Sequence, residues 1–157
     1  MDAHACITRI TLDDASIIRR TPEVEHERRI AMADLVEENQ FNLLASPTPP
    51  YEVFLSARDN RLLLQVSTPQ RADEPHEMIL ALRPFQRLIK DYFLMCESYF
   101  EAIKHAPADR IQTLDMARRS VHNEGAELLS NLLAPHASMD FDTARRLFTL
   151  ICVLHIK

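Results

Sequence analysis

The chain has 157 residues, 46% of them hydrophobic and 26% charged, which is typical of one folded domain spanning residues 1–157. Its formal charge of −5 argues against general nucleic-acid binding, because proteins of that class usually carry an excess of basic residues. Gly125 is the only glycine, so the chain cannot form the glycine-rich loops that hold dinucleotides and phosphates, and we expect no cofactor.

The N-terminal part of the sequence predicts a strand followed by a helix. Residues 6–12 alternate apolar and polar side chains, as a short strand does. Thr21 can cap a helix that runs from about Pro22 to Asn39, with proline at its first position and acidic residues in its first turn. The inward face of this helix should carry the following residues: Val24, Arg28, Ala31, Met32, Leu35 and Val36.

The clearest β signal is a hairpin whose turn is Arg58-Asp59-Asn60-Arg61, because Asp and Asn tolerate the positive φ of a two-residue turn. Pairing the two arginines places the apolar side chains of both strands on one face, as a half-buried sheet requires. This register pairs Ala57 with Leu62, Leu55 with Leu64, and Val53 with Val66. Residues 41–46 and 76–82 are further candidate strands, and residues 46–50 and 68–75 are predicted loops.

From Pro84 onward, the apolar residues recur with the period of a helix. They form one continuous inward stripe: Phe85, Leu88, Ile89, Tyr92, Phe93, Cys96, Tyr99, Phe100 and Ile103. One helix should end at Ala106-Pro107, a second should cover about Asp109 to Leu133, and a third should follow a cap at Asp140 or Asp142. The last helix is apolar nearly all round, which predicts a place in the middle of the domain. Together the elements predict an α+β fold: a small antiparallel sheet with a central hairpin, covered by one N-terminal helix and a C-terminal three-helix array.

The helix over residues 109–133 carries polar residues on its inward face. At helical spacing this face includes Asp115, Arg118, His122 and Gly125. Buried charges are costly unless they are paired, and a helical glycine usually marks the close approach of another backbone. Three interpretations remain open: a satisfied structural network, a site in which His122 titrates or binds a ligand beside Asn123 and Glu124, or a wrong helical phase.

Three arginine doublets each follow an acidic residue that stands three and four positions earlier, which allows ion pairs along a helix. Glu25 precedes Arg28-Arg29, Asp115 precedes Arg118-Arg119, and Asp142 precedes Arg145-Arg146. Alternatively, one arginine of each doublet pairs internally while the other binds a carboxylate or phosphate. Arg19-Arg20 lacks an upstream acid and is the doublet most available to a protein partner.

The cysteines and histidines add little further chemistry. Cys6, Cys96 and Cys152 form no CxxC pair, which predicts reduced thiols in a cytoplasmic protein. The acidic residues around His26 are those that a helix dipole favours, so we predict no metal site, and His155 is interpreted as a core residue. No export signal is recognised, and the longest apolar run, residues 147–156, is too short to span a membrane.

Four stretches of the sequence carry a resemblance to a known family. They are RRTPEVEHER (19–28), LIKDYFLMCESYFEAI (88–103), DMARRSVHNEG (115–125) and DFDTARRLFTLICVLH (140–155). With these stretches the chain resembles uncharacterised protein family 0262, a group of small alphaproteobacterial proteins. The resemblance implies a bacterial cytoplasmic protein of this size, and it carries over no catalytic residues.

Two functions are compatible with this sequence. The first is a non-enzymatic interaction or regulatory module with an unidentified protein partner, which Arg19 and Arg20 would contact. The second is a small enzyme or ligand-binding domain for an anionic small molecule, with His122, Glu124 and Asp115 as catalytic candidates. Its ligand-binding candidates are Arg118, Arg119, Asn123, His26 and Glu25. A sealed polar network would favour the first function, and an open pocket that also holds His26 or His155 would favour the second.

Overall fold

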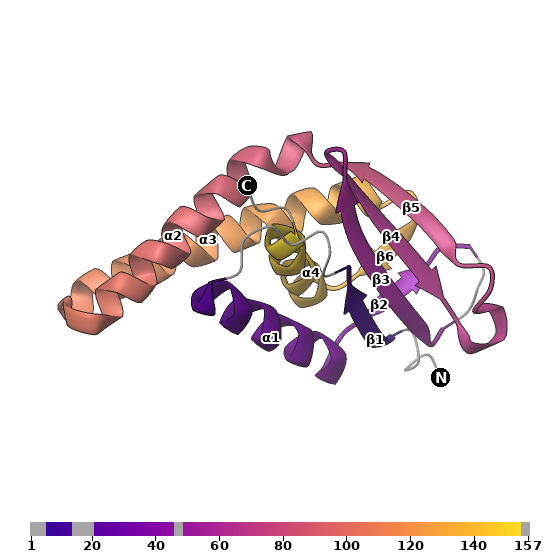
Figure 1. The fold of residues 1–157 in the computed structure, drawn as a ribbon, viewed down its shortest axis with the longest axis horizontal. Coiled ribbons are helices and arrows are strands. Elements are labelled where there is room, and N and C mark those ends of the chain that lie inside the picture. The colour runs from indigo at the N-terminus through magenta and orange to yellow at the C-terminus, as the bar shows by residue number, and fades with distance from the viewer. Residues whose placement is uncertain (1–5, 14–20, 46–48, 155–157) are drawn as a thin grey trace.

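The computed structural model describes residues 6–13, 21–45 and 49–154, and it has the predicted α+β fold (Figure 1). The main sheet has the strand order β1-β3-β4-β5, formed by β1 (Ile7–Leu12), β3 (Tyr51–Arg58), β4 (Arg61–Ser67) and β5 (His76–Ala81). A second sheet pairs β2 (Phe41–Leu43) with β6 (Ala137–Met139). The helices are α1 (Pro22–Glu37), α2 (Gln86–His105), α3 (Ala108–Leu133) and α4 (Phe141–Leu154).

The hairpin of β3 and β4 confirms the predicted turn and register. Asp59 and Asn60 have φ values of 53° and 62°, in the left-handed region that the turn requires. The cross-strand pairs are those predicted: Ala57 with Leu62, Leu55 with Leu64, and Val53 with Val66. The hairpin therefore presents an apolar face to the core, with β5 continuing the antiparallel pairing beyond β4.

The sheet differs from the prediction in two places. Strand β1 pairs with β3 in parallel, because the chain crosses over through α1 before it returns to the sheet. The candidate strand at residues 41–46 is shorter than predicted and lies outside the main sheet, where it pairs with β6. No local signal in the sequence predicted the three residues of β6.

The helix caps are partly those predicted. Thr21 Oγ1 accepts a hydrogen bond from the Val24 amide (3.2 Å), and Asp140 Oδ1 accepts one from the Thr143 amide (3.1 Å), so Asp140 and not Asp142 caps α4.

Two apolar residues predicted on inward faces are exposed instead. Val36 of α1 is 43% exposed and Ile103 of α2 is 47% exposed.

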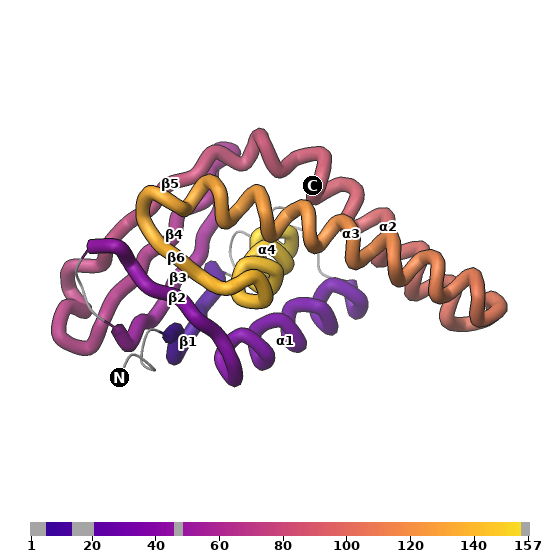
Figure 2. The backbone as a smooth tube through the Cα atoms, turned by 180° about the vertical axis from the view of Figure 1, so that it is seen from behind, coloured from indigo at the N-terminus to yellow at the C-terminus, as the bar shows by residue number. Residues whose placement is uncertain are grey.

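Helix α4 lies in the middle of the molecule, as predicted (Figures 1 and 2). Its residues from Leu147 to Leu154 are all at most 6% exposed. Helices α1 and α3 and strand β3 pack around it, while α2 packs mainly on α3. Helices α2 and α3 form a long hairpin that extends away from the sheet (Figures 1 and 2).

Gly125 allows α3 to lie directly on α4. A Cβ atom at this position would lie 2.5 Å from ring carbons of Phe148, which is closer than real Cβ contacts. The close neighbour is therefore an aromatic side chain, and the predicted approach of another backbone is wrong. Phe148 is fully buried, with the rings of Phe85 and Tyr92 at 6.3 Å, so it has little room to shift.

Replacing Gly125 by Ala should lower the free energy of unfolding by about 1–3 kcal/mol, because the added methyl group overpacks the contact with Phe148. Alanine favours a helix over glycine by about 1 kcal/mol. At a site with open space, the same substitution would therefore raise the free energy of unfolding. Urea unfolding measures the difference, with Ser120→Ala on the exposed face of α3 as the control. A Gly125→Ala variant at least as stable as the wild type would contradict the packing argument.

Candidate functional site

The polar residues on the inward face of α3 are half-buried, as the predicted helical phase requires. Asp115, Arg118 and His122 are each partly shielded from solvent, and Gly125 is buried. The alternative in which these side chains face bulk water is therefore wrong. Their neighbours lie on α2 and α4, because α3 packs between these two helices.

Arg118 has partners on both sides of its guanidinium group. Its Nη2 donates to Asp115 Oδ1 at 2.7 Å, and its Cζ lies 4.8 Å from the centroid of the Tyr99 ring. Burial opposes the charge, but the hydrogen bond to Asp115 and the field of Glu27 outweigh burial and raise the pKa of Arg118. Asp115 Oδ2 also lies 3.0 Å from Arg119 Nε, so this carboxylate is held by both arginines of its doublet.

His122 is enclosed by aromatic rings. Its ring centroid lies 5.1 Å from that of Tyr92 and 6.4 Å from that of Phe148, both in edge-to-face geometry. Burial, together with the charges of Arg118 and Arg145, lowers the pKa of His122 to about 4. The imidazole is therefore neutral at pH 7 and too weak a base to suit proton abstraction at that pH.

The other candidates do not join this cluster. Glu124 is exposed and pairs with Arg87 of α2 at 3.2 Å, and Asn123 is exposed. Glu25 pairs with Arg28 along α1 at 3.4 Å, and the exposed His26 lies with its ring centroid 6.2 Å from that of Phe100. Arg19, Arg20 and His155 lie outside the described residues.

The third arginine doublet has a different role from the predicted ion pair with Asp142. Arg146 Nη1 donates to the main-chain carbonyl oxygens of Glu38 at 3.0 Å and Asp34 at 3.5 Å. It thereby gives the Glu38 carbonyl at the end of α1 a donor, and it adds a second donor to the Asp34 carbonyl, which already accepts the Glu38 amide. Sequence reasoning missed this contact because the two elements stand more than a hundred residues apart.

The thiols and acidic clusters offer no catalytic centre in the described part of the chain. Burial raises the pKa of Cys96 to about 12 and raises that of Cys152, so both thiols stay protonated. No group of three or more His, Cys, Asp or Glu side chains among the described residues could hold a metal ion. No helix within these ranges has the length and apolar character needed to cross a membrane.

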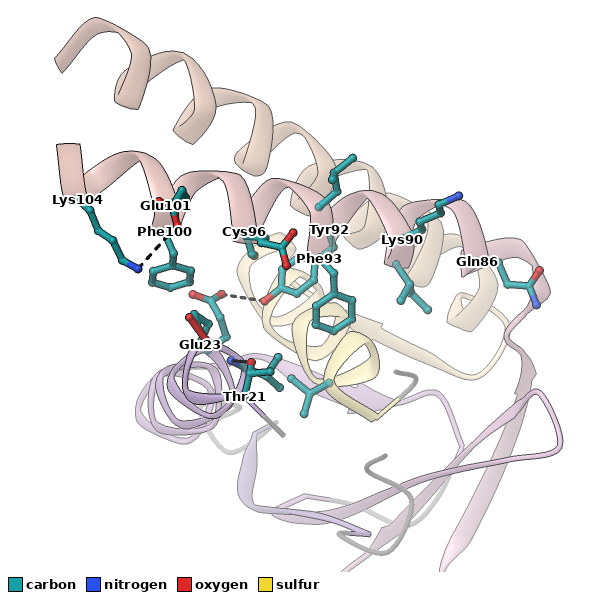
Figure 3. A pocket seen from close by; sticks show the side chains of 16 residues that line it. Thr21, Glu23, Gln86, Lys90, Tyr92, Phe93, Cys96, Phe100, Glu101 and Lys104 are labelled. Carbon is teal, nitrogen blue, oxygen red and sulfur yellow. Dashed lines mark hydrogen bonds and ion pairs between the residues drawn. The ribbon is translucent and has the colours of Figure 1, made fainter. Parts of the chain in front are cut away.

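A groove of about 620 Å³ runs along α2 beside the start of α1 (Figure 3). Its apolar lining comes from α1, α2 and the end of α4: Val24, Ile89, Phe93, Leu94, Phe100 and Val153. Figure 3 shows Phe93 and Phe100 pointing from α2 toward α1, with Glu23 at the facing end of α1. Leu94 is 52% exposed, so part of this apolar surface is open to solvent.

One hydrogen bond joins the two helices that border this groove. The Tyr92 hydroxyl donates to Glu27 Oε1 at 2.8 Å (Figure 3). Burial raises the pKa of Tyr92 well above its usual value, and the fields of Cys96 and Glu27 add to the effect, so the phenol keeps its proton. The pair therefore anchors α1 to α2 at the floor of the groove.

The groove exists because α1 and α2 each pack on other elements. Helix α1 packs on α4 and β1, helix α2 packs on α3, and the two helices have few contacts with each other. The sequence assigned Phe93 and Phe100 to a continuous core stripe, yet both are only half-buried. The sequence did carry a signal of this exposure, because the apolar stripe on α2 is wider than one neighbouring helix can cover.

The low pKa of His122 predicts that acid destabilises the fold. Between pH 6.5 and 4 the unfolded chain binds a proton at His122 that the folded chain does not, so the free energy of unfolding falls as the pH falls. The loss between pH 7.5 and 5 should reach up to about 2 kcal/mol. His122→Phe, which keeps a ring beside Tyr92 and Phe148, should remove most of that loss in urea unfolding at the two pH values.

The exposed His136 provides the control for this measurement. His136→Gln should leave the difference between the two pH values as it is in the wild type. If His122→Phe loses as much stability on acidification as the wild type, then His122 is not the neutral, enclosed group described above.

Comparison with known proteins places the chain in a family. The model of the Uncharacterised protein family (UPF0262) matches residues 4–157. A UPF0262 protein of Roseobacter denitrificans is 51% identical, with 95% of this chain and 96% of that protein aligned. A UPF0262 protein of Rhizobium etli is 49% identical, with 93% and 92% aligned. No solved structure matches the chain. The chain thus belongs to the uncharacterised protein family UPF0262, as its sequence motifs indicated.

Proposed function

We propose that the protein is a non-catalytic interaction module and that the groove between α1 and α2 is its binding surface. The observation that carries the proposal is the apolar floor of the groove, where the partly exposed Leu94 lies beside the half-buried rings of Phe93 and Phe100. Contiguous apolar surface that stays open to solvent usually marks a binding site. Most of the buried hydrophobic residues in the described part of the chain belong to one core cluster, which includes α4.

The chemistry of the polar cluster on α3 supports binding over catalysis. His122 is neutral and enclosed by rings, and Asp115 is held by two arginines. None of the described histidines lines the groove, and Tyr92, whose ring contacts His122, lies between that histidine and Glu27 of the groove lining. An enzyme that used His122 with Glu124 would need these side chains to turn toward one another, yet Glu124 is bound to Arg87.

We further propose that this module is a single domain that acts in the cytoplasm. Cys6, Cys96 and Cys152 are free thiols, and free thiols persist in reducing compartments. Cys96 and Cys152 are buried within helices that pack in the core, where a disulfide would not be needed for stability.

A synthetic helical peptide with one leucine face and a neutral glutamine face tests the binding surface. Fluorescence anisotropy should show binding to the wild type and at least ten-fold weaker binding to Leu94→Asp, because the leucine face of the peptide would cover the new carboxylate and remove water from it. Met116→Asp is the matched control, since Met116 is 64% exposed on α3 and does not line the groove. Absence of binding, or equal loss in both variants, would contradict the proposal.

A further inference from the structure

The two edges of the main sheet differ in how far the chain covers them. At the edge of β1, the Ile7 amide donates to Asn39 Oδ1 at 2.7 Å, and Asn39 Nδ2 donates to the Ile7 carbonyl oxygen at 2.9 Å. Helix α1 also packs beside β1. Strand β5 forms the opposite edge, at the margin of the molecule and away from α1 (Figure 1).

The outer edge of β5 carries a row of unpaired backbone groups. The Leu82 amide donates to the Asn60 carbonyl oxygen beside β4, so the backbone groups at every second position back along β5 face β4. The positions between them face away from the sheet, and they are exposed: Glu77, Ile79 and Ala81. Their amides and carbonyl oxygens have no hydrogen-bond partner among the described residues, so another strand can pair with them.

Strand β5 lacks most of the features that prevent pairing at a sheet edge. Its six residues include no lysine, arginine or proline, and its register with β4 runs without a bulge. Its outer face carries Ile79, which is 61% exposed and stands opposite the half-buried Leu63 of β4. An unblocked edge with an exposed β-branched residue favours the addition of a further strand.

The charged residues near this edge are arranged so that one end is positive and the other negative. Arg58 and Arg61 stand directly opposite each other beside the hairpin turn, and neither forms an ion pair with a described residue. Like charges in this position repel one another. The neighbour of Arg61 on β5 is the small Ala81. Toward the other end of β5, Glu77 Oε2 accepts a hydrogen bond from Gln65 Nε2 at 2.8 Å, which is a neutral group.

We infer that a second copy of the chain occupies this edge, with the two β5 strands antiparallel about a twofold axis. Placing Ile79 opposite its counterpart brings Glu77 opposite Ala81 of the second copy, so that every outward amide and carbonyl of β5 is paired. Centring the pair on Met78 would place Ala81 opposite Pro75, which has no amide. Centring it on Glu77 would place two carboxylates opposite each other.

The register centred on Ile79 also gives the outer-face side chains suitable neighbours. Leu63 and Ile79 of one copy continue into Ile79 and Leu63 of the other and form one apolar row across the seam. Arg61 and Glu77 of the second copy stand on either side of Ala81, two strand spacings or roughly 9.6 Å apart, within the combined reach of their side chains. The twofold axis repeats this contact, so both ends of the seam gain an ion pair.

Sedimentation equilibrium of the full chain over a dilution series tests the inference. A seam of six residues per strand buries less surface than a standard interface, so the wild type should form a dimer of twice 18.1 kDa that dissociates on dilution. Ile79→Pro removes an outward amide that β4 does not use, and it should weaken the dimer at least ten-fold. Ile79→Val keeps that amide and should dimerise as the wild type does. A wild type that stays monomeric up to about 1 mM would overturn the inference.

Two charge reversals test the register at low salt. Glu77→Arg places an arginine beside Arg61 of the second copy, and Arg61→Glu places a carboxylate beside Glu77 of the second copy, so each variant alone should dimerise about ten-fold more weakly than the wild type. An equimolar mixture of the two should recover the dimer, because each seam then holds two contacts between arginine and glutamate. A mixture as monomeric as its components would overturn the register.

Glu127→Arg provides the matched control, since it makes the same change in charge as Glu77→Arg at an exposed position of α3. It should leave the dimer as it is in the wild type, and an equal loss in both variants would contradict a local contact at β5.

One further variant separates this edge from the groove. Leu94→Asp should leave the dimer intact, because Leu94 lies on α2 and lines the groove. If Leu94→Asp converts the dimer to a monomer and Ile79→Pro does not, then the copies meet in the groove and the pairing of β5 is overturned. Binding of the leucine-faced peptide to Ile79→Pro should equal binding to the wild type, so the two surfaces are tested independently.

Discussion

Helix α4 has almost no polar face, and the rest of the fold is arranged to cover it. Helices α1 and α3 and the sheet lie around it, and Gly125 brings α3 close enough to contact the ring of Phe148. Arg146 extends from α4 to the end of α1 and holds that helix in place. Because α1 and α3 are both bound to α4, while α2 is bound to α3, helix α2 keeps an apolar face that the described elements leave open.

The half-buried polar residues of α3 are explained by the same packing. They lie where α3 passes between α2 and α4, so each must find a partner that shields it from an apolar environment. Arg118 pairs with Asp115 and lies over the face of the Tyr99 ring. His122 is neutral and lies beside the rings of Tyr92 and Phe148. These contacts favour a structural role for the cluster, although Arg118 Nε is buried without a hydrogen-bond partner, and an open apolar surface lies in the groove along α2.

Local patterns predicted most of the fold but little of the candidate site. The hairpin turn at Asp59-Asn60 and the cap at Thr21 follow from the preferences of neighbouring residues. The parallel pairing of β1, the short strand β6 and the contact from Arg146 to Glu38 depend on elements far apart in the sequence. The groove was missed for the same reason, because the exposure of Phe100 depends on how far α1 lies from α2.

Hydrogen exchange in the presence and absence of the peptide with a leucine face and a glutamine face tests the central claim, that the surface between α1 and α2 is where this protein binds its partner. The account predicts slower exchange confined to the start of α1 and to α2 between Gln86 and Lys104. Slower exchange centred on the outer face of α3 or on the main sheet, with α1 and α2 unchanged, would contradict it.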